Sequence, residues 1–171
     1  MSSPNCPASV RKTALRFVFH LIKQDNAEVA QFSEVVAKMR NEIKFCRRCH
    51  NISDKELCNI CGNTLRRQEM ICVVENIRDV IAIESTQQLN GVYHVLGGII
   101  SPLDGIGPQD LSIDALVERI GKEETSEVIF ALSPTIQGDT TIYYISKKLA
   151  AIQANLPHPV KITTIARGVS F

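Results

Sequence analysis

Apolar positions three and four residues apart dominate the first 43 residues of the chain. One such stripe predicts a helix from about Val10, after a loop over residues 1–9, and it consists of Leu15, Val18, Phe19 and Ile22. Asp25 and Glu28 resemble a capping box and predict the start of a second helix. A second stripe, which indicates a core or subunit-interface seam, consists of Val29, Phe32, Val36, Met39 and Ile43.

The pattern changes after about residue 68, where short apolar runs alternate with helical periodicity. The predicted strands cover 70–74, 92–96, 127–132 and 161–165. The predicted helices cover 76–86, 113–120 and 139–154, with Asn76 as the cap of the first. Strands and helices that alternate at these lengths predict an α/β domain with a parallel sheet. The whole chain is therefore expected to be a multi-module α+β and α/β protein.

Three modules follow from these patterns: a helical region over 1–44, a cysteine module over 45–67 and an α/β domain over 68–171. The 171 residues, 44% hydrophobic and 22% charged, suffice for one full domain and small modules. No apolar run reaches membrane-spanning length and no signal peptide is visible, so we expect a cytoplasmic protein without membrane partners.

The near-neutral total charge of +1 hides two halves of opposite sign. Residues 1–67 carry 12 Lys and Arg against 6 Asp and Glu, whereas residues 68–171 carry 7 against 12. A basic front half suggests a polyanionic partner, and an acidic back half suggests a different partner or a metal. Solvated surface charge is the plainer alternative for each half.

Four cysteines form two Cys-x-x-Cys pairs separated by eight residues, namely Cys46, Cys49, Cys58 and Cys61. This spacing predicts one closed, structural four-thiolate zinc site, in which the adjacent His50 is not needed as a ligand. Two disulfides or a redox pair are the alternatives. Neither is favoured, because no thioredoxin-like strand and helix surround the pairs and the context predicts a reducing cytosol.

Polar residues also gather where predicted strands end. Glu75 follows the first strand, Asp104 lies in the loop after the second, and Ser133 and Thr135 follow the third. A Glu after one strand and an Asp pair after another would hold magnesium for phosphoryl chemistry. Two hydroxyls are poor substitutes for that Asp pair, so a magnesium-dependent enzyme is the less favoured hypothesis.

Three stretches resemble one protein family. The cysteine module is followed by ICVVENIRDV over 71–80, then by YHVLGGIISPLDGIGP over 93–108 and TIARG over 164–168. Together they resemble the bacterial recombination mediator RecR from about Arg11 to Gly168. The resemblance implies a helix-hairpin-helix, a four-cysteine zinc finger and a Toprim domain that acts as a binding module without catalysis.

The same resemblance implies a function in recombinational DNA repair. Members of this family form a ring-like tetramer that clamps DNA and work with RecO, and in many bacteria RecF, to load RecA at gaps. Two departures stand out: the family's glycine-containing hairpin is replaced by CPASV over 6–10, and the family's C-terminal extension past the Ala-Arg-Gly motif is missing. The chain therefore resembles a family member truncated at both ends, for which we expect weaker DNA binding and a dimer.

The resemblance also implies site residues. Lys12 and Arg16 match the family's DNA-contacting Lys and Arg, with Arg11 beside them, and we expect sequence-independent contacts to duplex or gapped DNA. The partner surface for RecO is expected at Glu75, Asp79, Asp104 and Asp139. Two alternatives remain: a Toprim nuclease or primase-like enzyme, and a zinc-ribbon interaction module without a role on DNA.

Overall fold

The computed structural model describes residues 8–165, with side chains from Lys12 onward. These residues belong to two compact units that divide between Ile43 and Lys44. Among them, no helix is both long and apolar enough to cross a membrane. Residues 1–7 of the loop predicted over 1–9 lie outside the described residues, and residues 8 and 9 belong to the first helix.

The first unit is a pair of helices, α1 (Ala8–Ile22) and α2 (Asn26–Glu42). Phe17 and Phe32 bring them together, with ring centroids 5.5 Å apart in an edge-on arrangement. Two details of the prediction are wrong: α1 begins at Ala8 instead of about Val10, and the capping box does not form. Asp25 occupies the cap position of α2, but its side chain makes no cap hydrogen bond.

Most side chains of both apolar stripes are exposed, although Val29 and Ile43 are half-buried. Phe19 of α1 is 61% exposed and Met39 of α2 is 52% exposed, and no residue of α2 is buried. Two helices alone are too few to enclose a core, so the apolar side chains remain in contact with water. The core interpretation of the second stripe therefore fails within the described chain, and the subunit-interface interpretation stays a prediction.

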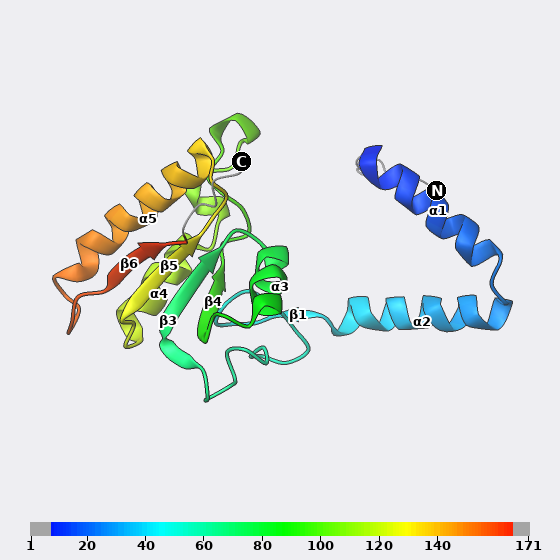
Figure 1. Cartoon of the computed structure of the whole chain (residues 1–171), viewed down its shortest axis with the longest axis horizontal. Coiled ribbons are helices and arrows are strands. Elements are labelled where there is room, and N and C mark those ends of the chain that lie inside the picture. The colour runs from blue at the N-terminus through cyan, green and yellow to red at the C-terminus, as the bar shows by residue number, and fades with distance from the viewer. Residues whose placement is uncertain (1–7, 166–171) are drawn as a thin grey trace. The chain divides into compact units, whose positions relative to one another are not determined.

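The second unit begins with a short antiparallel pair, β1 (Lys44–Phe45) and β2 (Ile52–Ser53). A four-stranded sheet follows, in the order β4-β3-β5-β6, and every neighbouring pair in it is parallel. Its strands are β3 (Arg67–Val74), β4 (Gly91–Val95), β5 (Glu127–Ala131) and β6 (Lys161–Thr164). The predicted parallel sheet is confirmed, and Figure 1 shows its strands pointing the same way.

Three α-helices connect these strands: α3 (Ile77–Thr86), α4 (Ile113–Lys122) and α5 (Ile136–Gln153). Two short 3-10 turns, η1 (Pro102–Asp104) and η2 (Pro108–Asp110), lie in the loop after β4. The largest boundary errors are at β3, which begins three residues before the predicted Met70, and at α5, which begins three before Asp139. The early start of α5 follows from its cap, because Thr135 Oγ1 accepts the Gly138 N–H at 3.1 Å.

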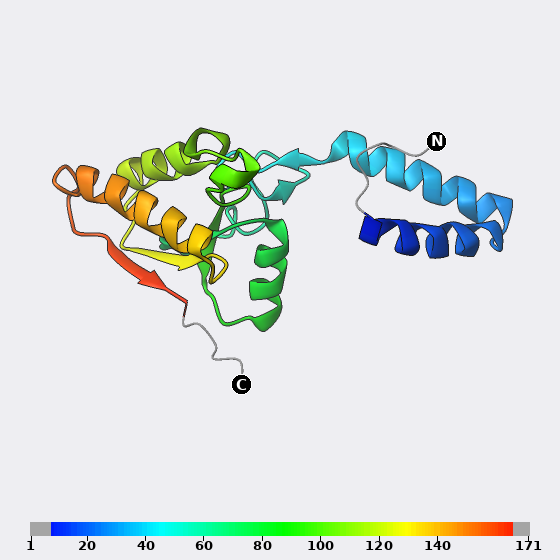
Figure 2. The same cartoon turned by 90° about the horizontal axis from the view of Figure 1, so that it is seen from above.

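The sheet separates two apolar layers. In β3, Ile71 and Val73 pack with α4 and α5, whereas Cys72 and Val74 pack with α3. This alternation is the two-residue period of a strand buried on both faces. Figure 2 shows α4 and α5 lying together and α3 across the sheet from them. Cys72 is fully buried, and burial raises the pKa of its thiol to about 12.

Candidate functional site

The four cysteines of the two Cys-x-x-Cys pairs converge on one point. Their Sγ atoms all lie within 4.8 Å of one another and all four residues are buried. Cys49 Sγ and Cys58 Sγ are 3.5 Å apart. Four thiolates around zinc, with Zn–S bonds of about 2.3 Å, stand about 3.8 Å from one another, so the cluster fits a tetrahedral ion. All five described cysteines are free thiols, which rules against the disulfide alternative within the described residues.

Local backbone geometry aims the sulfurs inward. His50 N–H donates to the Cys46 carbonyl and Gly62 N–H donates to the Cys58 carbonyl, each at 2.9 Å, which closes a tight turn in each half of the module. His50 has a φ of 62°, in the left-handed region that non-glycine residues seldom adopt. Hydrogen bonds from Cys49 and then from Cys61 lower the pKa of Cys58, whereas the hydrogen bond with Cys58 raises the pKa of Cys49, so Cys58 is the thiol that gives up its proton most readily.

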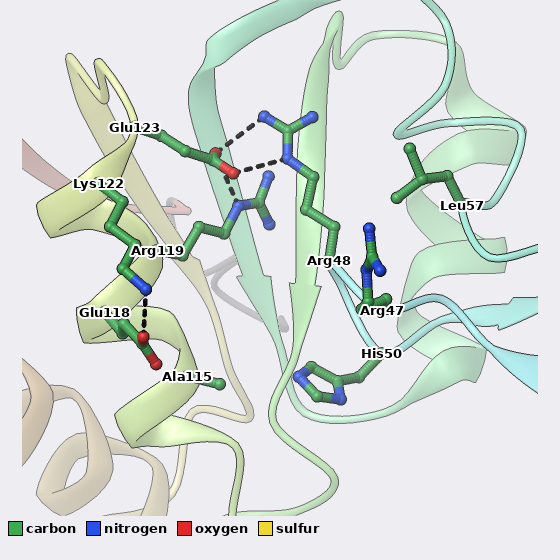
Figure 3. A pocket seen from close by; sticks show the side chains of 9 residues that line it. All are labelled: Arg47, Arg48, His50, Leu57, Ala115, Glu118, Arg119, Lys122 and Glu123. Carbon is green, nitrogen blue, oxygen red and sulfur yellow. Dashed lines mark hydrogen bonds and ion pairs between the residues drawn. The ribbon is translucent and has the colours of Figure 1, made fainter.

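Arg48, within the first cysteine pair, connects the cysteine module to Glu123 at the C-terminal end of α4. Its Nε and Nη2 donate to the two carboxylate oxygens of Glu123, each at 2.8 Å (Figure 3). Its Nη1 also donates to Gln68. Arg119 donates to the same carboxylate at 3.0 Å. Burial would raise the pKa of Glu123, but the hydrogen bond from Arg48 and the charge of Arg119 outweigh it, and the pKa is lowered.

A second arginine holds the other end of the module. Arg66 donates to both carboxylate oxygens of Glu84 on α3, at 2.9 and 2.5 Å, and the Tyr93 hydroxyl donates to the same carboxylate at 2.8 Å. The cysteine module is thus tied to helices of both apolar layers, α4 through Arg48 and α3 through Arg66. Sequence reasoning missed these ties, although Arg48 within the first cysteine pair and Arg66 at the end of the module were a visible signal.

Two histidines lie where the module meets β4. The rings of His50 and His94 are 5.4 Å apart in an edge-on arrangement. His94 is fully buried, one of its ring nitrogens bonds the Ser112 carbonyl at 2.8 Å, and burial lowers its pKa to about 3. Directly beside it, Val95 N–H donates to the Cys49 carbonyl at 2.9 Å, which links β4 to the cysteine pair.

The hydroxyls that stand in place of an Asp pair both have partners. Ser133 Oγ donates to Glu75 Oε2 at 2.6 Å, and Thr135 caps α5. Gly138, in the first turn of α5, lies so close to Ser133 that a Cβ there would stand 2.0 Å from its carbonyl oxygen. Glu75 is therefore hydrogen-bonded to a hydroxyl, and the hydroxyls of Ser133 and Thr135 are poor ligands for magnesium.

The other acidic candidates also make local contacts. Asp79 accepts the Asn76 N–H at 2.9 Å and completes a capping box at α3, and Asp104 accepts the Ser101 hydroxyl at 2.5 Å. Asp139 is exposed in the first turn of α5 instead of starting the helix. Glu75, Asp104 and Asp139 follow β3, β4 and β5 in turn, so all three belong to segments that leave the same edge of the parallel sheet.

The basic candidates lie on α1 in the helical unit. Lys12 and Arg16 are exposed and one helical turn apart, so they share a side of the helix. Arg11 belongs to α1, but its side chain lies outside the described residues. The structure thus leaves the two described cations available to solvent and to a partner.

Comparisons with known proteins match both parts of the second unit. Residues 43–63 match a family model described as the four-cysteine zinc finger domain of RecR, and residues 69–166 match one described as Toprim domain. The chain is 54% identical over 165 residues to the recombination protein RecR of Phocaeicola vulgatus, covering 96% of this chain and 78% of that protein. It is 52% identical to the RecR proteins of Bacteroides fragilis and Amoebophilus asiaticus, covering 96% of this chain and 78% and 79% of theirs.

These matches agree with the geometry of the described unit. The buried cluster of thiols is a four-cysteine zinc finger, in which the four thiolates would fill every coordination position of a structural zinc ion. The parallel sheet with its flanking helices is a Toprim domain. The chain is 54% identical to a RecR protein of which it covers 78%, and the zinc finger and Toprim family models match successive parts of it. The chain therefore belongs to the RecR family.

Proposed function

We propose that this protein is a non-enzymatic, DNA-binding clamp in recombinational repair that acts with RecO, and with RecF where present, to help load RecA at gaps. Membership of the RecR family supports this, since relatives such as that of Phocaeicola vulgatus are named recombination proteins. A cytoplasmic location at the nucleoid is part of the same proposal. The Toprim domain serves as a binding module, and the zinc finger stabilises the fold beside it.

The pair Lys12 and Arg16 is the observation that carries the DNA-binding part. Both are exposed on one side of α1, in the half of the chain with the excess of positive charge. The described side chains of α1 and α2 include no ion pair to either residue, so both charges are available to phosphates. Arg11 adjoins them in sequence. Contacts of this kind act through charge and do not distinguish base sequence.

Fluorescence anisotropy with duplex and gapped DNA of several sequences tests this proposal. We expect sequence-independent binding that weakens as salt rises, and Lys12→Ala/Arg16→Ala should reduce the salt slope by roughly one unit for each lost contact. Lys38→Ala/Arg40→Ala removes the same charge from α2 and is the matched control. Binding that survives the first change, or that ignores salt, would assign the helical unit to another partner.

Self-association is the second part of the proposal. The exposed apolar side chains of α1 and α2 would be covered by a second copy of this unit, and several copies would bring several Lys12 and Arg16 pairs to one DNA. Light scattering would compare the wild type with Phe19→Asp, which places a charge on the 61% exposed stripe position. A mass that is unchanged by this substitution would place the subunit contact elsewhere.

The competing enzyme hypothesis has a direct test at Glu75. Its carboxylate already accepts a hydrogen bond from Ser133, and the nearby hydroxyls are not the ligands that magnesium prefers. Incubation of labelled DNA with the protein and magnesium should therefore leave the DNA intact. Metal-dependent cleavage that disappears in Glu75→Gln would overturn the non-enzymatic proposal.

A further inference from the structure

A cavity of about 430 Å³ opens between the first cysteine pair and α4 (Figure 3). Arg47, Arg48 and His50 line it from the cysteine module, and Arg119 and Lys122 line it from α4. Neither the zinc ligands nor the acidic sheet edge contribute to its walls. The cavity lies wholly within the second unit, so it is distinct from the Lys12 and Arg16 pair of the first.

The charges around this cavity do not balance. Glu123 is a single carboxylate that accepts hydrogen bonds from both Arg48 and Arg119, which leaves one positive charge in excess at that group. Glu118 accepts from Lys122 at 2.5 Å, and the carboxylate that pairs with Arg47, Glu56, does not line the cavity. The lining therefore carries four cations against two carboxylates. Such a surplus beside a partly enclosed space attracts anions.

Arg119 has a donor that no described residue uses. Its Nε donates to Glu123 at 3.0 Å and its Nη1 donates to the Tyr93 carbonyl at 2.9 Å. Its Nη2 is buried and has no hydrogen-bond partner among the described residues. A buried guanidinium N–H without an acceptor is unfavourable, so a ligand atom that accepts from Arg119 would stabilise this wall of the cavity.

The two outer cations are held only loosely. The Arg47 side chain is 77% exposed and stands 3.7 Å from Glu56, while the Lys122 side chain is 72% exposed beside Glu118. Exposed pairs of this kind contribute little to stability, because water competes for both charges. Arg47 and Lys122 can therefore exchange these partners for a ligand that accepts from both walls at once.

We propose that this cavity binds a phosphate group, either as free phosphate or as part of a nucleic-acid backbone. A phosphate offers several oxygens in a tetrahedral arrangement, so it can accept from Arg47, Arg119 and Lys122 together. The planar guanidinium fork suits phosphate oxygens, and the ammonium of lysine adds a point charge. A single carboxylate carries less charge, and its two oxygens lie in one plane, so it matches donors on opposite walls less well than a tetrahedral phosphate does.

Calorimetric titration of the zinc-loaded full chain with inorganic phosphate tests the proposal. Arg47→Gln/Lys122→Gln removes the two loosely held cations and should weaken phosphate binding at least about tenfold, the loss expected when two charge-assisted hydrogen bonds are removed. Arg78→Gln/Lys147→Gln removes two exposed cations of the same unit outside the cavity and should bind as the wild type does. Zinc content, measured for each variant, should stay unchanged.

Duplex DNA then separates the two sources of phosphate. With Lys12→Ala/Arg16→Ala as the background, adding Arg47→Gln/Lys122→Gln should lower the remaining DNA affinity and the salt slope if a backbone phosphate enters the cavity. If only free phosphate enters, phosphate binding is lost and DNA binding is unchanged. Phosphate binding that is absent, that survives Arg47→Gln/Lys122→Gln, or that acetate matches in affinity would overturn the proposal.

Discussion

Arg48 and Glu123 stand 75 residues apart in the sequence, and both carboxylate oxygens of Glu123 accept from one guanidinium. The exposed fractions of the two side chains are 23% and 29%, so the pair is partly shielded from water. Arg119 approaches the same carboxylate from α4 and is itself nearly buried, at 5%. This three-residue cluster, together with the Arg66–Glu84 pair and the hydrogen bond from Val95 to Cys49, connects the zinc finger to the Toprim sheet.

Removing the carboxylate charge should destabilise this junction. In Glu123→Gln, two partly buried guanidinium groups lose their counter-charge, and we expect the free energy of unfolding to fall by about 2 kcal/mol, between the values typical of exposed and of buried pairs. Urea denaturation of the zinc-loaded protein measures this difference. Glu56→Gln is the matched control, because its pair with Arg47 is 3.7 Å long and highly exposed.

The control should change stability by less than about 0.5 kcal/mol, as most exposed pairs do. A Glu123→Gln effect no larger than that of Glu56→Gln would mean that the junction is held by other contacts. A double-mutant cycle with Arg48→Gln would then separate the contribution of the pair from that of Arg119.

Zinc should be retained at one ion per chain and be needed for folding. In Cys58→Ser one of four thiolates is lost, and because structural zinc sites in isolated fingers contribute on the order of 10 kcal/mol, we expect loss of bound zinc and of soluble protein. Elemental analysis in reducing buffer measures the metal. Cys72→Ala, at a buried cysteine outside the cluster, should keep its zinc. Wild-type protein without zinc would refute the prediction.

Burial of His94 should make stability depend on pH. Its folded pKa of about 3, lowered chiefly by burial, lies below the unfolded value of roughly 6.5, so the unfolded chain binds the extra proton between these values. Stability is therefore fully present above the unfolded pKa and is lost as pH falls below it. From pH 7.5 to 5.5 the loss should be about 1.4 kcal/mol for this group.

Urea denaturation at the two pH values, compared between the wild type and His94→Gln, isolates this effect. The variant should lose less stability on acidification than the wild type does. His20→Gln, at an exposed histidine of α1, provides a control that should follow the wild type. An equal acid sensitivity in His94→Gln and the wild type would contradict the assignment to this residue.

The carboxylates at the edge of the sheet, Glu75 and Asp104 among them, should strengthen RecO binding through their negative charge. Glu75→Gln/Asp104→Asn removes two charges but leaves an amide oxygen to accept from Ser133 and Ser101, so the fold should be unaffected. We expect roughly tenfold weaker binding to a basic partner, most of it in the rate of association and strongest at low salt. Surface plasmon resonance with RecO measures both, and the exposed Glu124→Gln is the control. Unchanged affinity would place the RecO surface elsewhere.

Local patterns allowed much of this structure to be predicted. The cysteine spacing identified the metal centre, because eight intervening residues leave few ways to arrange two tight turns. The strands of the Toprim sheet were recognisable from short β-forming runs between helices. Both kinds of signal depend on residues close in sequence, which is where propensity and periodicity carry information.

Contacts between distant residues could not be predicted in this way. Nothing near Arg48 in the sequence indicates Glu123, and only the packing of α4 beside the cysteine module brings them together. Capping shows the same limit at short range. Asn76 forms its predicted cap at the half-buried start of α3, and Asp79 completes it as a capping box that was not predicted. Asp25 and Glu28 have the same spacing at an exposed helix start, where water competes for the N–H groups.

The hydrogen bond from Val95 to the Cys49 carbonyl has a consequence for aggregation. β4 pairs with β3 on one side only, so its outer backbone groups form an edge that could recruit another chain. The first cysteine pair covers that edge at Val95 while zinc holds the pair in place. Loss of zinc would uncover a buried, apolar strand edge, so metal depletion would lead to intermolecular strand pairing in preference to a soluble unfolded chain.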